Sequence, residues 1–89
     1  MNLIKQKREL NAVTTMLTLE APEIAAKALP GQFVIVRSGE LGERIPLTIA
    51  DYDRVDGTIS IIFQKVGAST MALGALQEGE MLTDLAGPL

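Results

Sequence analysis

The sequence predicts an all-β domain: a small six-stranded antiparallel barrel of Greek-key type with one short helix. Apolar segments rich in β-branched residues recur at roughly even spacing, and turn signals separate several of them. Only after Val66 does the apolar period change to one typical of a helix. A chain of 89 residues has room for one compact domain. A sandwich or an open sheet also fits the pattern, but closing the sheet removes exposed edges, which favours a barrel.

The first two predicted strands form a hairpin. Residues 3–10 and 13–19 alternate between apolar and other side chains, and residues 11–12 provide a tight turn between them. The second strand is expected to end at Pro22, because proline cannot donate a hydrogen bond to a sheet ladder.

A connecting segment and a third strand follow. Residues 23–29 are compatible with a turn of helix or a loop, and Pro-Gly at 30–31 is a strong turn signal. The β-branched run at 32–37 is expected to be a buried strand. Residues 38–43 form a polar loop that contains glycine.

The second half contains three further predicted strands and the helix. Residues 44–50 form an apolar strand interrupted by a proline, and residues 58–63 form the clearest strand, after an Asp-Gly hairpin turn at 56–57. Residues 69–73 favour a short helix that a Ser or Thr side chain caps. The last short strand is expected at 81–85.

Composition excludes several classes of function. The chain has no Cys, no His and no Trp, so it has no disulfide framework, no thiolate metal site and no histidine base. The formal charge of −3 and the absence of a Lys/Arg cluster give no reason to expect nucleic-acid binding. No run approaches the length that spans a bilayer, and the charged amino terminus does not resemble a signal peptide, so we expect a cytoplasmic protein without membrane contact. A bound cofactor would have to supply any chemistry.

Arg44, Pro46 and Thr48 form the first candidate site. Proline inside an apolar strand removes a ladder hydrogen bond, so it is tolerated at an edge, at a bulge or where a ligand replaces the neighbouring strand. The period of a strand places these three side chains on one face, where a cation, a flat ring and a hydroxyl suit a phosphate-bearing aromatic cofactor. The alternative is an edge strand with an ordinary surface arginine.

Gly67, Ala68, Ser69 and Thr70 form the second candidate site, directly before the predicted helix. A turn of small residues that leads into a helix exposes backbone N–H groups, which favour a phosphate. The alternative is a routine Ser or Thr cap after a glycine turn.

Four segments together resemble a known family. In order along the chain they are PGQFV at 30–34, RIPLTI at 44–49, QKVGAST at 64–70 and GPL at 87–89. Their order resembles that of the FAD-binding barrel of the ferredoxin–NADP reductase superfamily. The similarity is closest to the branch containing the electron-transfer subunit of dihydroorotate dehydrogenase and the small subunit of bacterial ferredoxin–NADP oxidoreductase, also described as sulfide dehydrogenase.

This resemblance implies a set of FAD-binding residues and no catalytic or metal-binding side chains. Arg44 is implied to bind the pyrophosphate, Pro46 and Leu47 to line the flavin, and Thr48 to lie near the flavin N5 edge. The remaining implied cofactor-binding residues are Ile45, Ile62, Phe63, Gln64, Gly67, Ser69 and Thr70. Two positions depart from the wider family pattern: Pro46 replaces a common tyrosine, as the named branch tends to do, and Ser69 replaces a glycine.

The resemblance also implies the biological role. The expected role is that of an FAD-binding module of an oxidoreductase that passes electrons between NAD(P)H and an iron–sulfur partner. The NAD(P) domain and the cysteine-ligated [2Fe–2S] cluster of such proteins have no counterpart in this sequence, so residues 1–89 are expected to be a domain truncated before a nucleotide-binding domain and inactive alone. Two alternatives stay open: a homodimer of the domain, and a cofactor-free barrel that serves as an interaction or assembly module.

Overall fold

The computed structural model of the protein describes residues 2–39 and 42–89. Within these ranges the elements are β1 (Asn2–Glu9), β2 (Thr14–Glu20), α1 (Pro22–Lys27), β3 (Phe33–Arg37), β4 (Ile45–Asp53), β5 (Thr58–Gln64), α2 (Ala68–Gly74), β6 (Met81–Leu82) and β7 (Asp84–Ala86). Glu40 and Leu41, in the predicted loop after β3, lie outside the described residues.

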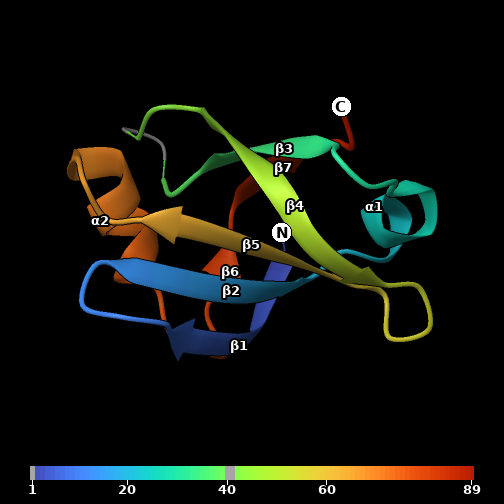
Figure 1. Cartoon of the computed structure of the whole chain (residues 1–89), viewed down its shortest axis with the longest axis horizontal. Helices are drawn as coiled ribbons and strands as arrows, with labels where there is room; N and C mark the ends of the chain where they lie inside the picture. The colour runs from blue at the N-terminus through green and yellow to red at the C-terminus, as the bar shows by residue number, and fades with distance from the viewer. Residues whose placement is uncertain (1, 40–41) are drawn as a thin grey trace.

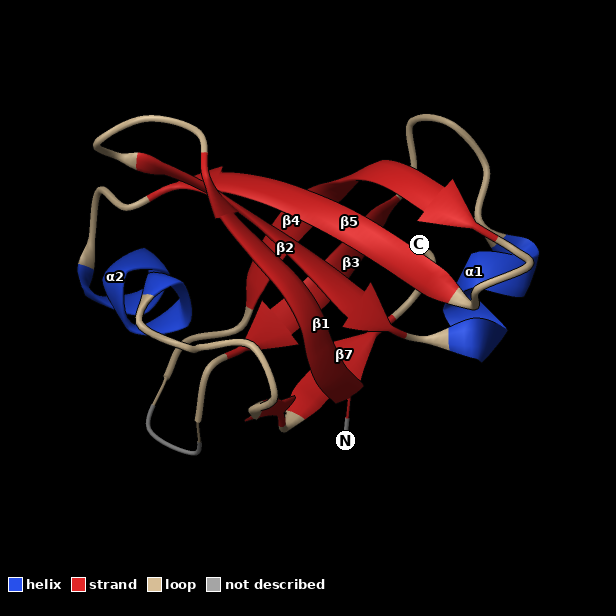
Figure 2. Ribbon diagram, turned by 90° about the horizontal axis from the view of Figure 1, so that it is seen from below, coloured by secondary structure: helices blue, strands red, loops and turns tan. Residues whose placement is uncertain are grey.

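All seven strands belong to one antiparallel sheet, with the order β6-β1-β2-β5-β4-β3-β7. Strand β5 lies between β2 and β4, so strands distant in the chain are neighbours, as in a Greek key. The two outermost strands, β6 and β7, are consecutive in the chain, and the sheet curls into a nearly closed barrel (Figures 1 and 2). The predicted barrel class is therefore confirmed.

The barrel has one strand more than the sequence pattern predicts, because the segment 81–85 is divided. The chain bends at Thr83, so that β6 pairs with β1 on one side and β7 pairs with β3 on the other. The alternation of side chains over residues 81–85 fits one strand or two equally well. Only the positions of the partner strands require the break.

The structure also has a second helix, α1, where the sequence left a turn of helix or a loop open. Pro22 occupies the start of α1, where its missing N–H costs nothing and its fixed φ suits the helix. Ile24 and Ala25 of α1 are buried against the barrel. Arg54 donates hydrogen bonds from its guanidinium to the carbonyl oxygen atoms of Ala26 (3.4 Å) and Ala28 (2.6 Å), which satisfies the end of α1.

Apolar side chains from all parts of the barrel fill its interior. Leu17, Leu19, Ile59 and Ile61 are fully buried on the inner faces of β2 and β5. The alternation expected for residues 13–19 is confirmed in β2. Thr15 is the exception on this face. Its hydroxyl is buried and donates a hydrogen bond to a Glu9 carboxylate oxygen at 2.9 Å, so the polar group is satisfied.

The helices of the described part of the chain are all too short to cross a membrane.

Candidate functional site

The outer face of β4 carries the side chains of the first candidate site. Pro46 and Thr48 are exposed there, and Arg44, which directly precedes β4, is exposed as well. Ile45 and Leu47 alternate with them, and their side chains pack against the core. The predicted grouping of a cation, a ring and a hydroxyl on one face is therefore present, whereas Ile45 and Leu47 are partly buried against the core.

Residues 45–48 pair with a neighbouring strand on one side only within the described part of the chain. Pro46 lies opposite Ile35 of β3, but the pairing between β4 and β5 begins at Ile49 and Ile61. Figure 1 shows β4 and β5 diverging from this point toward α2. The one-sided pairing explains why proline is tolerated in this strand, because it has no β5 ladder to interrupt.

The end of β5 forms the opposite side of this divergence. Ile62 and Gln64 are exposed, and Ile62 lies opposite Met16 of β2. Phe63 instead points into the core, where its side chain is 4% exposed. Of the three β5 residues implied by the resemblance, Ile62 and Gln64 present side chains to the outside, and Phe63 presents backbone alone.

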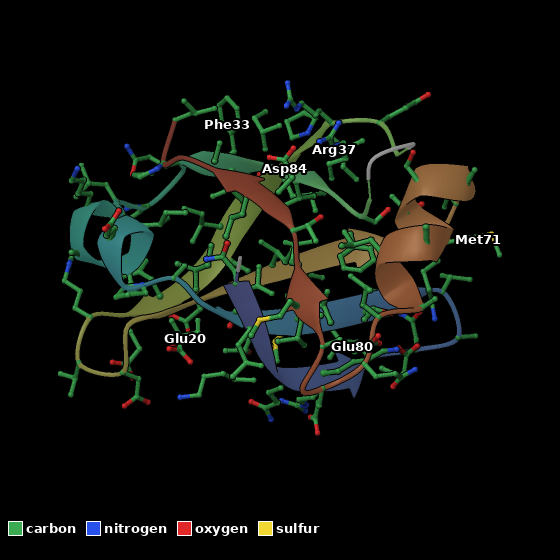
Figure 3. The ribbon with its side chains drawn as sticks, turned by 180° about the vertical axis from the view of Figure 1, so that it is seen from behind. Glu20, Phe33, Arg37, Met71, Glu80 and Asp84 are labelled. Carbon is green, nitrogen blue, oxygen red and sulfur yellow. The ribbon has the colours of Figure 1, made fainter. Side chains whose placement is uncertain are left out.

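Arg44 belongs to a cluster of charges that also contains Arg37 and Asp84. The Asp84 Oδ2 atom lies 2.9 Å from Nη2 of Arg37 and 3.4 Å from Nη2 of Arg44. Figure 3 shows Arg37 and Asp84 close together beside β3 and β7. The Arg44 side chain is 65% exposed, so its guanidinium retains donors that can meet a ligand.

Arg37 and Asp84 are site residues that the sequence analysis missed. The pairing of Phe33 with Thr48 fixes the register of β3 and β4, and extending that register by one pair beyond the last bridge places Arg37 beside Arg44. A sequence argument that paired these two strands would therefore have found Arg37. The position of Asp84 could not be predicted from the pairing of β3 and β4, because it depends on the bend at Thr83.

The second candidate site lies at the start of α2. The helix begins at Ala68 with Gly67 as its N-cap, not at Ser69 as the sequence pattern predicts. The Thr70 hydroxyl accepts hydrogen bonds from the backbone N–H groups of Val66 and Gly67, both at 3.0 Å, and donates to the Gly67 carbonyl oxygen at 3.1 Å. Thr70 therefore acts as an internal cap, and its hydroxyl is committed to the turn.

The fold itself does not require glycine at position 67. Gly67 has φ −147° and ψ 176°, an extended conformation that any residue adopts. A Cβ atom at this position would meet no other atom within 4 Å. The glycine therefore leaves open space beside the first turn of α2, whose N–H groups lack partners within the helix.

The start of β4, the end of β5 and α2 lie at the same end of the barrel (Figures 1 and 2). The strand topology thus brings the two candidate sites, which are separated by about 20 residues in sequence, to one region. This region offers exposed apolar side chains, an arginine and backbone N–H groups.

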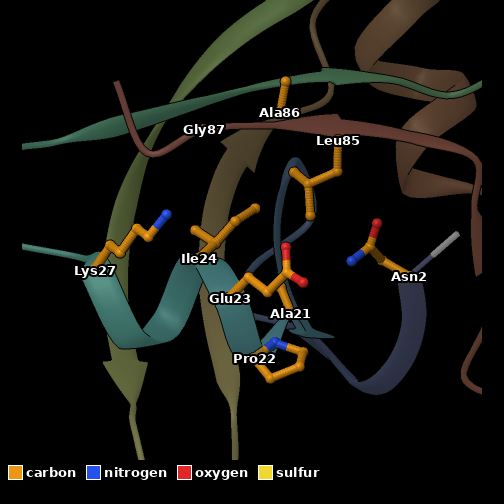
Figure 4. Close-up of a pocket in the computed structure, with 9 residues that line it drawn as sticks. All are labelled: Asn2, Ala21, Pro22, Glu23, Ile24, Lys27, Leu85, Ala86 and Gly87. Atoms are coloured by element: carbon orange, nitrogen blue, oxygen red, sulfur yellow. The ribbon is translucent and has the colours of Figure 1, made fainter.

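Two hollows in the described structure lie elsewhere. A hollow of about 470 Å³ lies between α1, the start of β1 and the end of β7, and Pro22, Lys27, Asn2 and Leu85 are among its lining residues (Figure 4). A second, of about 560 Å³, lies between β1, the end of β5 and the end of α2. Neither of these two hollows is lined by a predicted site residue.

Comparison with known proteins identifies relatives that are longer than this chain. An uncharacterized protein of the adh 3′ region of Clostridium beijerinckii is 50% identical over 86 residues, which are 97% of this chain and 29% of that protein. A protein named as a homologue of the dihydroorotate dehydrogenase B (NAD(+)) electron transfer subunit, from Thermotoga maritima, is 41% identical over 71 residues, which are 80% of this chain and 25% of that protein. No family model matches.

A solved structure shows the same barrel. A chain of the NADH-dependent reduced ferredoxin-NADP oxidoreductase, described in connection with flavin-based electron bifurcation, superposes with a TM-score of 0.95 and 35% identity, over 99% of this chain and 32% of that one. The 89 residues thus span roughly a quarter to a third of the length of these similar proteins.

Proposed function

Because the chain is homologous to a segment of the dihydroorotate dehydrogenase B electron transfer subunits and has the barrel fold of a ferredoxin-NADP oxidoreductase chain, we propose that it is the FAD-binding module of an electron-transfer oxidoreductase. In this proposal the module takes part in passing electrons between NAD(P)H and an iron–sulfur partner. The 89 residues contain no Cys, so cysteine ligands of such a cluster would come from outside them.

The observation that supports this proposal most is the one-sided pairing of residues 45–48. These residues face away from β3 toward the exposed end of β5, without a strand between them. Backbone groups on this side of β4 are therefore available to a ligand. A cofactor-free barrel gives no reason for β4 and β5 to separate where proline lies between Arg44 and Thr48.

The residues of this region fit the chemistry of FAD. The Arg44 guanidinium suits the pyrophosphate, because its planar fork binds two phosphate oxygen atoms at once. Pro46 and Ile62 offer apolar surface to a flat ring system, since both residues are exposed, Ile62 by 42%. The Thr48 hydroxyl can bond to a polar ring edge. When bound, FAD links two-electron transfer from a nicotinamide to one-electron transfer.

The start of α2 completes the proposed site. The N–H groups of its first turn and the open space at Gly67 suit close approach of the pyrophosphate. Ser69 is half-buried in this turn and is proposed to contribute its hydroxyl or its backbone N–H. Thr70 contributes by holding the turn in shape, since its own hydroxyl bonds to Gly67. Gln64 is proposed to face the ribityl or adenosine portion of the cofactor.

FAD binding to the chain tests this proposal directly. The Kd for FAD is measured by flavin fluorescence for the unmodified chain, for Arg44→Ala and for the control Lys27→Ala. The control removes a positive charge from α1, in the wall of the 470 Å³ hollow. We expect Arg44→Ala to weaken binding by about 10- to 150-fold, which corresponds to the 1.5–3 kcal/mol of a charged hydrogen-bonded contact. Lys27→Ala should bind like the unmodified chain.

Two results would contradict the proposal. A folded chain that retains no FAD would support the cofactor-free interaction module instead. Equal FAD affinity in the Arg44→Ala variant, with a loss in Lys27→Ala, would move the ligand from the face of β4 to the hollow beside α1.

A further inference from the structure

The carboxylate of Asp84 contacts Arg37, at the end of β3, and Arg44, which directly precedes β4. Arg37 and Asp84 are cross-strand partners in the β3–β7 ladder, and their side chains are 29% and 28% exposed. The 2.9 Å contact between them is therefore reinforced by the backbone register. Arg44 reaches the same oxygen atom at 3.4 Å and is 65% exposed.

The two contacts of this oxygen atom differ in character. The shorter contact lies between half-buried groups and holds the carboxylate in place. The longer contact involves an exposed arginine, and such pairs contribute little to stability because solvent screens them. Arg44 is thus free to take another anion, whereas Asp84 is not free to rotate away when that anion arrives.

We propose that Asp84 limits the affinity of Arg44 for the diphosphate of the cofactor. An anion bound to the Arg44 guanidinium lies close to the Asp84 carboxylate, because both are held by the same side chain. The two negative groups repel each other, so the Asp84 carboxylate weakens the attraction between the anion and Arg44. This inference rests on the proposed function, since it names what regulates affinity at the same site.

The opposite role for Asp84 predicts a change in FAD affinity of the opposite sign. If the carboxylate served mainly to orient Arg44, removing its charge would weaken anion binding. The 3.4 Å separation and the exposure of Arg44 argue against strong orientation. The sign of the change in FAD affinity therefore distinguishes the two roles.

The test is a double-mutant cycle on FAD affinity. The Kd for FAD is measured for the unmodified chain, Asp84→Asn, Arg44→Ala and the double variant, at a temperature where thermal denaturation shows each to be folded. Asp84→Ser is a second neutral variant in case Asp84→Asn does not fold. Asp56→Asn, in the exposed turn between β4 and β5, is the control for the change in net charge.

We expect Asp84→Asn and Asp84→Ser to bind FAD about twofold to fivefold more tightly, the range that exposed charge pairs contribute. The gain should be absent in the Arg44→Ala background and in Asp56→Asn. Unchanged or weaker binding in both folded neutral variants overturns the inference, as does an equal gain in the Arg44→Ala background.

Inorganic pyrophosphate separates this inference from the proposed function. If the unmodified chain does not bind FAD, the proposed function fails, and the same variants are then titrated with inorganic pyrophosphate. Tighter pyrophosphate binding by the neutral Asp84 variants would support the inference alone. Absence of pyrophosphate binding in every variant, or equal binding in all of them, would overturn it.

Discussion

A carboxylate introduced at position 67 should weaken cofactor binding without a loss of stability. Asn and Asp are good N-cap residues of nearly equal size, and the extended backbone at Gly67 accepts either. The Thr70 hydroxyl already accepts a hydrogen bond from the Gly67 N–H. A side-chain oxygen at position 67 would accept one from the Thr70 N–H in return and complete a reciprocal cap. Both variants should be as stable as the unmodified chain or a few tenths of a kcal/mol more stable.

The magnitude for FAD follows from the one charge by which the two variants differ. A carboxylate about 5 Å from a phosphate charge costs about 1 to 3 kcal/mol at an effective dielectric constant between about 80 and 20. Gly67→Asp should therefore bind FAD about 5- to 150-fold more weakly than Gly67→Asn. The steric effect of the new side chain is common to both variants, so the ratio isolates the charge.

Thermal denaturation and FAD titration of the two variants provide the measurement. Equal FAD affinity of Gly67→Asp and Gly67→Asn, with both folded, would refute the placement of a phosphate beside the first turn of α2. A loss of stability in both variants would instead refute the conclusion that the fold leaves position 67 open.

Three further predictions concern the fold. The pKa of Glu9 is lowered, mainly by its hydrogen bond to Lys65 (2.6 Å), so the contribution of Glu9 to stability is present above the unfolded pKa near 4.5 and is lost as pH falls through the lower folded pKa. In denaturant titrations, the difference in unfolding free energy between the unmodified chain and Glu9→Gln should therefore shrink below about pH 4.5. A constant difference would contradict this. Leu17→Ala should cost about 2–5 kcal/mol in the same titrations, because Leu17 is fully buried, whereas the exposed control Val55→Ala should cost little. Asn11→Ala should cost about 1 kcal/mol, because the Asn11 side chain accepts hydrogen bonds from two backbone N–H groups in the β1–β2 turn (3.0 and 2.9 Å). An unchanged denaturation midpoint would show that the turn does not depend on the Asn11 side chain.

The local pattern of the sequence was sufficient for most of the fold. Alternation over residues 13–19 predicted which side chains of β2 share a face, and the run at 58–63 predicted β5. The signal at 56–57 predicted the β4–β5 turn, where Gly57 has a positive φ of 70°. The extra strand was not predictable in the same way, because the division into β6 and β7 depends on their long-range pairing with different strands, β1 and β3. Periodicity carries no information about such partners.

The sequence predicted which side chains of the candidate site share a strand face, but not which hydrogen bonds and ion pairs they form. Period-2 geometry placed Arg44, Pro46 and Thr48 together correctly. The role of Thr70 as an internal cap depends on the geometry of its turn, and the presence of Asp84 beside Arg44 depends on the bend at Thr83 and the β3–β7 pairing. No local pattern specifies either.

Amide hydrogen exchange of the chain with and without saturating FAD shows where on the backbone the cofactor binds. We expect FAD to slow exchange in residues 44–48, 62–64 and 67–70 and to leave exchange unchanged in residues 22–27 and 85–87 beside the hollow of Figure 4. Protection confined to residues 22–27 and 85–87, or no protection at all, would contradict this expectation.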